Sequence, residues 1–321
     1  MQSFSELLSQ FEHIFAQHHF PTQPSTLYEP CSYLLNMGGK RIRPVVCLMS
    51  HELFEPLNEN VWNTAIAIEL FHNFTLMHDD IMDQAPLRRG FPTVHEKYNV
   101  STAILSGDVM NIYAYEHLNK IQTKYIHLVL ELFNKTAIEI CEGQQLDMDY
   151  EQRPFVSPQE YLDMITLKTS VLLGTSLKLG AMLGGATDGC SEVLYEYGKC
   201  AGIAFQLKDD LLDAYGAVAK TGKQIGGDIL SNKKTYLSTK AYELANEDQK
   251  KIFAELLARQ DANKVEDTLR FFDELGVKQQ LEQEIIQYTE KAYEFLEKVP
   301  VMDRRKTHLR ALTDMLLKRE S

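Results

Sequence analysis

Apolar residues recur at helical spacing, three or four positions apart, along almost all of this 321-residue chain. Strict alternation of apolar and polar residues, which marks a half-buried strand, is missing. The sequence therefore predicts an all-α fold, a bundle of about a dozen helices. The predicted helices cover residues 4–19, 25–36, 41–54, 59–83, 100–120, 124–150, 158–168, 170–184, 190–216, 232–258, 263–274, 278–297 and 302–319.

The residues that mark helix ends and linkers support this organisation. A clear helix start is Ser157-Pro158-Gln159-Glu160, which combines a capping Ser, a Pro at the first helical position and a Glu that closes a capping box. Pro residues are scattered, and no Gly/Ser run or block of like charge divides the chain. We therefore expect residues 1–321 to form a single domain.

Composition argues against several classes of function. The net charge of −12, with no concentrated basic surface, argues against nucleic-acid partners. No window reaches 18 uninterrupted apolar residues, so we expect no integral membrane segment. The five Cys show no C-x-x-C spacing and follow no signal peptide. They indicate reduced thiols in a cytoplasmic protein.

Two copies of an acidic motif, D-D-x-x-D, stand at 79–83 and 209–213, each after a long apolar stretch without Pro. On a helix the first and last Asp of each copy lie one turn apart on the same face. Such carboxylates repel one another unless a cation lies between them, and hard oxygen ligands suit magnesium. Solvated acidic faces are the alternative explanation, but two copies in apolar helices disfavour it. The pair predicts a central cavity in which several magnesium ions meet a phosphorylated substrate.

Basic residues accompany both motifs. Lys40 and Arg43 follow Gly38-Gly39 at a helix start, where free backbone N–H groups already attract phosphate. Arg88-Arg89-Gly90 comes after the first motif, and Gly222-Lys223 comes after the second. Each pattern is common by itself, so only their combination is informative.

Taken together, these motifs resemble the trans-isoprenyl diphosphate synthases, which include farnesyl and geranylgeranyl diphosphate synthases. The resemblance covers nearly the whole chain in the motif order of that family. The matching segments are G-G-K-R-I-R-P at 38–44, H-D-D-I-M-D at 78–83, R-R-G at 88–90, S-G-D at 106–108, G-Q-Q-L-D at 143–147, L-K-T at 167–169, F-Q-L-K-D-D-L-L-D at 205–213 and G-K-x-x-G-x-D at 222–228. The chain departs from the family at Asn232, where Gly is usual, and at Leu237, where Pro is common.

The resemblance implies a condensation reaction. An allylic diphosphate loses pyrophosphate to give a carbocation, the double bond of isopentenyl diphosphate attacks it, and a proton is lost. It also implies an isoprenoid-synthase helical bundle, magnesium as the cofactor with three ions per active site, and a homodimer.

The resemblance further implies roles for individual residues. The leading magnesium ligands would be Asp79, Asp83 and Asp209. The other acids would bind the metal directly or support those that do: Asp80, Asp210 and Asp213. The allylic diphosphate would be held by Arg88, Lys168 and Lys223. Isopentenyl diphosphate would be held by Lys40, Arg43, His72 and Arg89. The carbocation would be faced by Gln206 and by the backbone carbonyls of Lys168 and Thr169.

Some of these residues have simpler explanations when taken alone. His72 lies two helical turns before Asp79 on the same face, but a single His is also explained as a core residue. Arg41 fits a structural or solvent role better than its neighbours Lys40 and Arg43 do.

Other functions share parts of the pattern. A class I terpene cyclase has the same fold, but it replaces the second acidic motif and does not need Lys40 and Arg43. An HD-type phosphohydrolase would use His78-Asp79 and leave the second motif unexplained. A non-catalytic partner subunit would lose acidic motifs that are intact here.

The residues before Asp79 bear on product length. A growing prenyl tail would descend along this helix, and Phe74 lies about 7.5 Å along the axis from Asp79. Phe71, one turn further, is equally well explained by packing between helices. Phe74 followed by the smaller Thr75, with an uninterrupted acidic motif, resembles archaeal-type geranylgeranyl synthases. We expect a C15 to C20 product, with geranylgeranyl diphosphate favoured over the alternative, farnesyl diphosphate.

Overall fold

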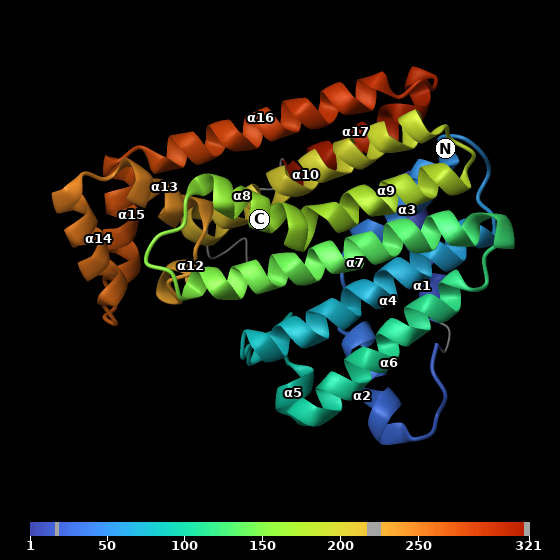
Figure 1. The fold of residues 1–321 in the computed structure, drawn as a ribbon, viewed down its shortest axis with the longest axis horizontal. Coiled ribbons are helices and arrows are strands. Elements are labelled where there is room, and N and C mark those ends of the chain that lie inside the picture. Colours follow the sequence, from blue (N-terminus) through green and yellow to red (C-terminus); the bar gives the residue numbers. More distant parts are fainter. Residues whose placement is uncertain (17–18, 217–225, 318–321) are drawn as a thin grey trace. The chain divides into compact units, whose positions relative to one another are not determined.

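The computed structural model describes residues 1–16, 19–216 and 226–317, and most of these residues are helical (Figure 1). The all-α prediction is confirmed. Within the described ranges the only strands are β1 (Leu87–Arg88) and β2 (Phe91–Pro92), which pair antiparallel. Arg89 and Gly90 join them with positive φ angles, the geometry of a tight hairpin turn. Two-residue strands are too short for an alternating pattern to appear in the sequence.

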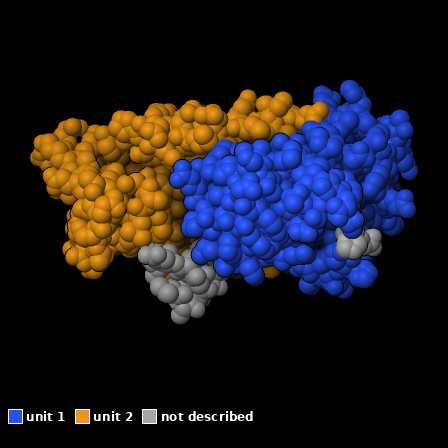
Figure 2. Space-filling view, turned by 90° about the horizontal axis from the view of Figure 1, so that it is seen from below, with its two compact units in different colours: residues 1–133, 176–191, 301–308 blue, residues 134–175, 192–300, 309–321 orange. Residues whose placement is uncertain are grey.

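The chain forms two compact units (Figure 2). Unit 1 comprises residues 1–133, 176–191 and 301–308, and unit 2 comprises residues 134–175, 192–300 and 309–321. Four boundaries fall within helices, which are α7 (Thr123–Glu151), α9 (Val171–Leu183), α10 (Asp188–Tyr215) and α17 (Asp303–Leu317). A fifth, at 300/301, falls in the short connection between α16 (Val277–Lys298) and α17. The single-domain organisation stays a prediction.

Unit 1 is organised around α4, which packs against α3 and α6 (Figure 1). Its elements, besides parts of the shared helices, are α1 (Phe4–Phe15), α2 (Ser25–Asn36), α3 (Ile42–Glu52), α4 (Glu59–Met82), β1, β2, α5 (Val94–Lys97) and α6 (Val100–Leu118). Core residues such as Leu48, Ile68 and Met110 are fully buried, and each contributes about 1.5–3 kcal/mol to stability. This packing fixes α4, whose C-terminal end holds the first acidic motif.

In unit 2 three helices, α13, α14 and α15, gather at one end of α16 (Figure 1). The elements specific to this unit are α8 (Pro158–Ile165), η1 (Thr166–Ser170), α12 (Gly227–Leu230), α13 (Tyr236–Leu244), α14 (Glu247–Ala258), α15 (Lys264–Glu274) and α16 (Val277–Lys298). The Ser157 side chain caps α8, and Glu160 closes the predicted capping box.

The predicted helices differ from the structure in several places: α1 ends at Phe15, and the short helices α5 and α12 were not predicted. The predicted helix over 232–258 is broken at Ala245, because Asn246 caps α14 by accepting from the backbone N–H groups of Asp248 and Gln249. The Gln249 side chain completes a capping box, a signal present in the sequence that apolar periodicity outweighed. The predicted gap between 158–168 and 170–184 is filled by the π-helical segment η1, which joins α8 to α9.

The structure also bears on the predicted absence of membrane segments. Across residues 1–16, 19–216 and 226–317, no helix is both long enough and apolar enough to cross a bilayer.

Candidate active site

The first acidic motif lies at the C-terminal end of α4, where Asp83 is the C-cap residue with helical φ and ψ. Asp79 and Asp83 therefore lie one turn apart on the same face, as the sequence predicts. Asp79 is half-buried and Asp83 is exposed, whereas Asp80 is only 2% exposed. The two outer carboxylates are placed to meet a ligand, and the middle one is turned into the protein.

Arg88 holds the middle carboxylate. Its Nε and Nη2 donate to the two oxygens of Asp80, both at 2.8 Å, in a bidentate ion pair. Because Arg88 ends β1, the hairpin after α4 brings its guanidinium back to the motif. Bidentate pairs of this kind are strong and geometrically specific. Arg88 thus contacts Asp80, and its role toward the allylic diphosphate stays a prediction.

A cationic cluster, defined here as Arg43, His72 and Arg89, lies in the same unit. Arg43 Nη1 donates to His72 Nε2 at 3.2 Å, and the charges of both guanidinium groups act on His72. Arg89 donates to the carbonyl oxygen of Gly38, and a Cβ on Gly39 would lie 3.0 Å from its guanidinium nitrogens. Gly39 therefore leaves room for Arg89. Lys40 is exposed directly after Gly39.

The electrostatics of this cluster favour an anion. Burial, followed by the positive charge of Arg43, lowers the pKa of His72 well below its usual value. The imidazole is therefore neutral at pH 7 and can accept from Arg43. The Nε of Arg43 is buried and has no hydrogen-bond partner among the described residues. A buried N–H without a partner costs free energy, and an anion bound at the cluster would satisfy it.

Arg41 has the structural role predicted for it. It is buried and forms an ion pair with Glu69, which also accepts from Asn73 Nδ2 at 2.9 Å. Its Nη2 donates to the carbonyl of Leu35 at 2.8 Å. These contacts tie α2 and the start of α3 to α4, so Arg41 shapes the cluster without belonging to it.

Phe71 and Phe74 differ in their surroundings. Phe71 is 3% exposed, and its ring centroid lies 5.1 Å from that of Phe133 on α7. Phe74 is half-buried, with its ring 4.8 Å from that of His78. Phe71 is therefore a core residue, the simpler of the two explanations considered. Phe74 keeps accessible surface one turn before the motif.

The second acidic motif lies on α10, and Asp213 is tied to the start of α12. Its Oδ2 accepts from the backbone N–H of Asp228 at 3.0 Å, and its carbonyl accepts from that of Gly226 at 2.7 Å. Both partners belong to the matching segment at 222–228. Lys223, in the same segment, lies outside the described residues.

Neutral groups hold Asp210, the middle acid of the second motif. It accepts from the Tyr161 hydroxyl at 2.6 Å, from the Tyr236 backbone N–H at 3.2 Å and from Gln206 Nε2 at 3.3 Å. Burial raises the pKa of Asp210 to about 7, although these hydrogen bonds act to lower it. Gln206 contacts Asp210, and its role toward the carbocation stays a prediction.

Lys168 and Thr169 lie within η1, where Val171 N donates to the carbonyl of Thr166, five residues earlier. π-helical turns occur often at functional sites. Gly143 of α7 allows this segment to approach closely, since a Cβ there would lie 2.3 Å from Lys168 N. Lys168 Nζ donates to Asp147 Oδ2 at 2.6 Å.

Sequence reasoning missed three residues of this second half. Asp147 and Gln144 belong to the G-Q-Q-L-D segment, which received no role, although their i,i+3 spacing puts both on one face of α7. Gln144 is 7% exposed, and its amide has no hydrogen-bond partner within the described chain. Tyr161 lies 49 residues from its partner Asp210, and no spacing pattern connects them.

The acidic side chains fit magnesium. No group of three His, Cys, Asp or Glu side chains in the described part of the chain forms a complete metal site. Magnesium, however, usually takes one or two protein carboxylates and completes its shell with substrate phosphates and water. Asp79 and Asp83 in unit 1, and Asp209 in unit 2, match that requirement.

Comparison with known proteins identifies the family. Residues 24–275 match the family described as polyprenyl synthetase. The chain belongs to the polyprenyl synthetase family. A relative from Methanosarcina mazei, a geranylgeranyl diphosphate synthase, is 44% identical over 224 residues, which is 69% of either chain. A crystal structure of a geranylgeranyl pyrophosphate synthase matches with a TM-score of 0.94 at 41% identity and covers 100% of both chains.

A further polyprenyl synthetase structure bears on the metal. The polyprenyl synthase from Caulobacter crescentus, complexed with calcium and isoprenyl diphosphate, matches with a TM-score of 0.86 at 26% identity. The match covers 99% of this chain and 96% of that chain. Polyprenyl synthetases use magnesium, in agreement with the carboxylates found here.

Proposed function

We propose that this chain is a short-chain trans-prenyltransferase that condenses isopentenyl diphosphate with allylic diphosphates and favours geranylgeranyl diphosphate as product. The observation that carries the proposal is the cationic cluster beside an intact first acidic motif. A condensing enzyme must hold a second diphosphate that does not ionise, and this cluster can do so without metal. The family and the names of its relatives support the same reaction.

The carboxylates prepare the allylic substrate. When bound, magnesium supplies Lewis-acid stabilisation of the departing pyrophosphate, and we propose three ions per active site. Asp79, Asp83 and Asp209 would hold these ions beside the allylic diphosphate. Asp80 and Asp210 are engaged within the protein, so they keep the neighbouring carboxylates in position. Arg88, Lys168 and Lys223 are the cations proposed for the allylic diphosphate.

The cationic cluster, together with Lys40, would hold isopentenyl diphosphate. The Nε of Arg43, which has no partner in the described ranges, gives it a donor for a phosphate oxygen, while Nη1 remains on His72. Phosphate contacts of this kind are charge-assisted and directional. Neutral His72 orients Arg43 without adding a charge.

The carbocation would be steadied by dipoles rather than by a full charge. Gln206 is half-buried on α10, and the carbonyls of Lys168 and Thr169 belong to η1. Fixed dipoles of this type stabilise developing positive charge without reorganising at the moment of reaction.

We also propose a homodimer and a cytoplasmic location. Ile104, Leu105 and Ile112 on α6 are 44%, 58% and 58% exposed. A row of large apolar side chains on one helix is typical of a protein–protein contact. None of the five Cys, all of which lie in the described part of the chain, forms a disulfide, as expected in a reducing compartment.

A coupled assay tests the reaction. The full-length protein is incubated with magnesium, labelled isopentenyl diphosphate and dimethylallyl diphosphate, and products are separated by chain length. We expect pyrophosphate release only with both substrates, and a C20 product. Release from the allylic substrate alone would indicate a cyclase, and orthophosphate a hydrolase. A protein that does nothing would be a partner subunit, and a C15 product would identify the farnesyl alternative.

A further inference from the structure

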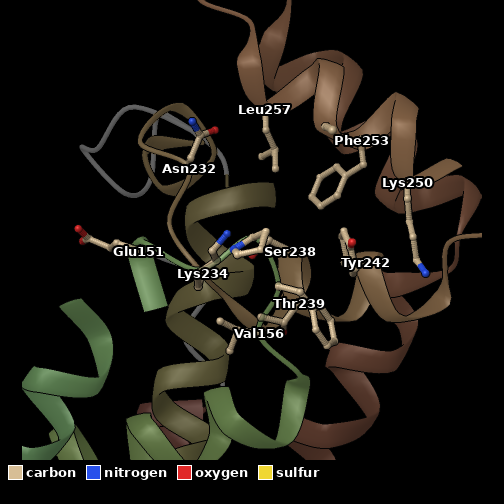
Figure 3. Close-up of a pocket in the computed structure, with 13 residues that line it drawn as sticks. Glu151, Val156, Asn232, Lys234, Ser238, Thr239, Tyr242, Lys250, Phe253 and Leu257 are labelled. Carbon is tan, nitrogen blue, oxygen red and sulfur yellow. The ribbon is translucent and has the colours of Figure 1, made fainter. Parts of the chain in front are cut away.

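Unit 2 contains a pocket whose described lining includes none of the residues assigned to the reaction. It lies between the residues after α7 and helices α13 and α14, and Figure 3 shows its lining. Its volume of about 410 Å³ falls within the range of roughly 300–1,000 Å³ that is typical of small-molecule sites. A folded peptide or protein partner does not fit a space of this size.

One wall of the pocket is apolar and fixed in place. Phe253 and Leu257 of α14 form it, with Tyr242 of α13 beside them (Figure 3). The Phe253 ring stacks on Phe271 with centroids 5.3 Å apart, and the Tyr242 ring lies 4.8 Å from that of Phe155. These contacts hold the rings in one arrangement, so an entering hydrocarbon chain meets a preformed surface.

Lys234 supplies a cation to the same pocket. Its side chain lies beside Ser238, across from Phe253 (Figure 3). Burial lowers the pKa of Lys234. No side-chain hydrogen bond or ion pair to Lys234 occurs in the described chain. The hydroxyl groups of Ser238 and Thr239 are already used, because they donate to backbone carbonyls of their own segment.

A neighbouring lysine, Lys264, has a structural role, and its buried ammonium group has a full set of hydrogen-bond acceptors. Lys264 is 1% exposed and donates to Leu230 O, Asn232 Oδ1 and Leu257 O at 3.3, 2.8 and 3.1 Å. Asn232 and Leu257 both line the pocket, so Lys264 braces its walls. Lys234 has no such set of partners among the residues that the structure describes, and an anionic ligand would provide them.

The other charged residues of the described lining do not compete with Lys234 for an anion or pair with its ammonium group. Lys250 is paired with Glu247 at 2.9 Å. Glu151 lies at the edge, and its carboxylate points away from Lys234 (Figure 3). Among its described lining residues, the pocket therefore combines one available cation with an apolar wall.

We propose that this pocket binds a single-chain amphiphile with a phosphate head, such as an alkyl or prenyl phosphate of about ten carbons. The phosphate contacts the Lys234 ammonium, and the hydrocarbon chain lies against Phe253 and Leu257. No bond is made or broken, so the site is a binding site separate from the proposed reaction.

Calorimetric titration of the full-length protein with decyl phosphate, in EDTA and without magnesium, tests the proposal. Lys234→Gln is expected to weaken binding about tenfold to a hundredfold through loss of one charge-assisted contact. Ala254→Trp, at an exposed position of the lining, is expected to fill the pocket and abolish binding. Lys251→Gln is the matched control: this exposed lysine of α14 pairs with Asp248 outside the pocket and should bind normally.

Three further arms locate the ligand. Decanol and inorganic phosphate should each bind far more weakly than decyl phosphate, and Arg43→Ala should bind decyl phosphate as the unmodified chain does. The proposal is overturned if Lys234→Gln and Ala254→Trp both keep full affinity, or if either half-ligand binds as tightly as the whole. It is equally overturned if Arg43→Ala removes binding, because the ligand would then occupy the cationic cluster. None of these measurements involves condensation, so their failure leaves the proposed function untouched.

Discussion

The two acidic motifs share one pattern, but their surroundings have opposite electrostatic character. In the first motif the middle carboxylate, Asp80, forms a bidentate pair with the Arg88 guanidinium, and three more guanidinium groups act on the nearby His72. In the second motif the middle carboxylate, Asp210, meets a phenol, an amide and a backbone N–H, and its pKa rises to about 7. The outer acids of both motifs are less buried than the middle ones.

This difference shows that the pattern fixes geometry and leaves charge to the surroundings. Helical spacing puts the outer carboxylates where a ligand can reach them. The middle carboxylate anchors the helix end, and either a charged or a neutral set of donors can hold it. Unit 1 brings fixed cations to its motif, whereas Lys168 in unit 2 already pairs with Asp147.

The largest expected effect is a loss of turnover on substitution of the outer acids, and we expect the two motifs to be equivalent in this respect. Asp79→Ala and Asp209→Ala should each lower kcat by about a thousandfold or more, because loss of a metal ligand removes several kcal/mol of charge stabilisation. The measurement is turnover at saturating magnesium, with circular dichroism to verify folding. Asp149→Ala, at an exposed position of α7, is the control and should keep full activity. Near-native turnover in one variant would break the equivalence.

Substitution of the two middle acids should change the free energy of unfolding by different amounts. Asp80→Asn leaves the Arg88 guanidinium without its partner charge and should cost about 3–5 kcal/mol. Asp210→Asn keeps an oxygen acceptor for Tyr161 and removes a poorly solvated carboxyl, so stability at pH 7 should change by less than about 1 kcal/mol. Urea unfolding of both variants measures the difference. Equal losses would show that both motifs anchor their middle acid in the same way.

Substrate affinities should divide between the two regions. Arg43→Ala should raise the KM for isopentenyl diphosphate about ten- to a hundredfold, the value of one charge-assisted phosphate contact, with little change for the allylic substrate. Lys168→Ala should show the reverse. Steady-state kinetics with each substrate varied in turn provides the test. If Arg43→Ala affects the KM of both substrates equally, or that of the allylic substrate alone, the assignment of the two substrates to these sites is wrong.

Product length should depend on α4 rather than on α10. We expect the Phe74 ring to form the floor of the prenyl-chain site, the surface that stops the growing tail. Phe74→Ala should remove this floor and lengthen the product by at least one isoprene unit, seen by chromatography of labelled products. The residue five positions before Asp209 is already Ala204, and the nearest aromatic residue is Phe205. Phe205→Ala is the matched control and should leave chain length unchanged. An unchanged product from an active, folded Phe74→Ala enzyme would remove Phe74 as the floor.

The smallest effect is a pH dependence specific to unit 1. Burial lowers the pKa of His72 in the folded state, while the unfolded chain keeps the ordinary value of 6.5. As pH falls below 6.5, the unfolded state binds a proton that the folded state does not, so the free energy of unfolding decreases. His72→Gln should weaken that decrease between pH 7 and pH 5 in urea unfolding without ligand. An identical slope in His72→Gln and the unmodified chain would mean that His72 carries its charge in the folded state.

What could be predicted from the sequence was local. Helix positions, the capping box at Ser157 and the one-turn spacing of Asp79 and Asp83 follow from short-range periodicity, and the structure reproduces them. The break at Asn246 also had a local signal, but apolar periodicity continued across it. The roles given to individual residues in the reaction stay predictions that the variants above address.

What could not be predicted depends on packing between distant segments. The Tyr161 hydroxyl reaches Asp210 only because α8 lies against α10, and no pattern within either helix reports that contact. The bidentate contact between Arg88 and Asp80 has the same origin, since a hairpin with two-residue strands decides where the guanidinium points. The π-helical segment is invisible to periodicity because it adds a single residue to an otherwise regular helix.

Because of that added residue, the number of residues between α8 and α9 determines which way the side chains of α8 face. Each residue of an α-helix advances the chain by about 100° of rotation. Loss of one codon at Ser170 would restore a regular helix between α8 and α9 and turn everything before it by about that angle. Tyr161 would swing away from Asp210, and Lys168 from Asp147, although both side chains would still be encoded.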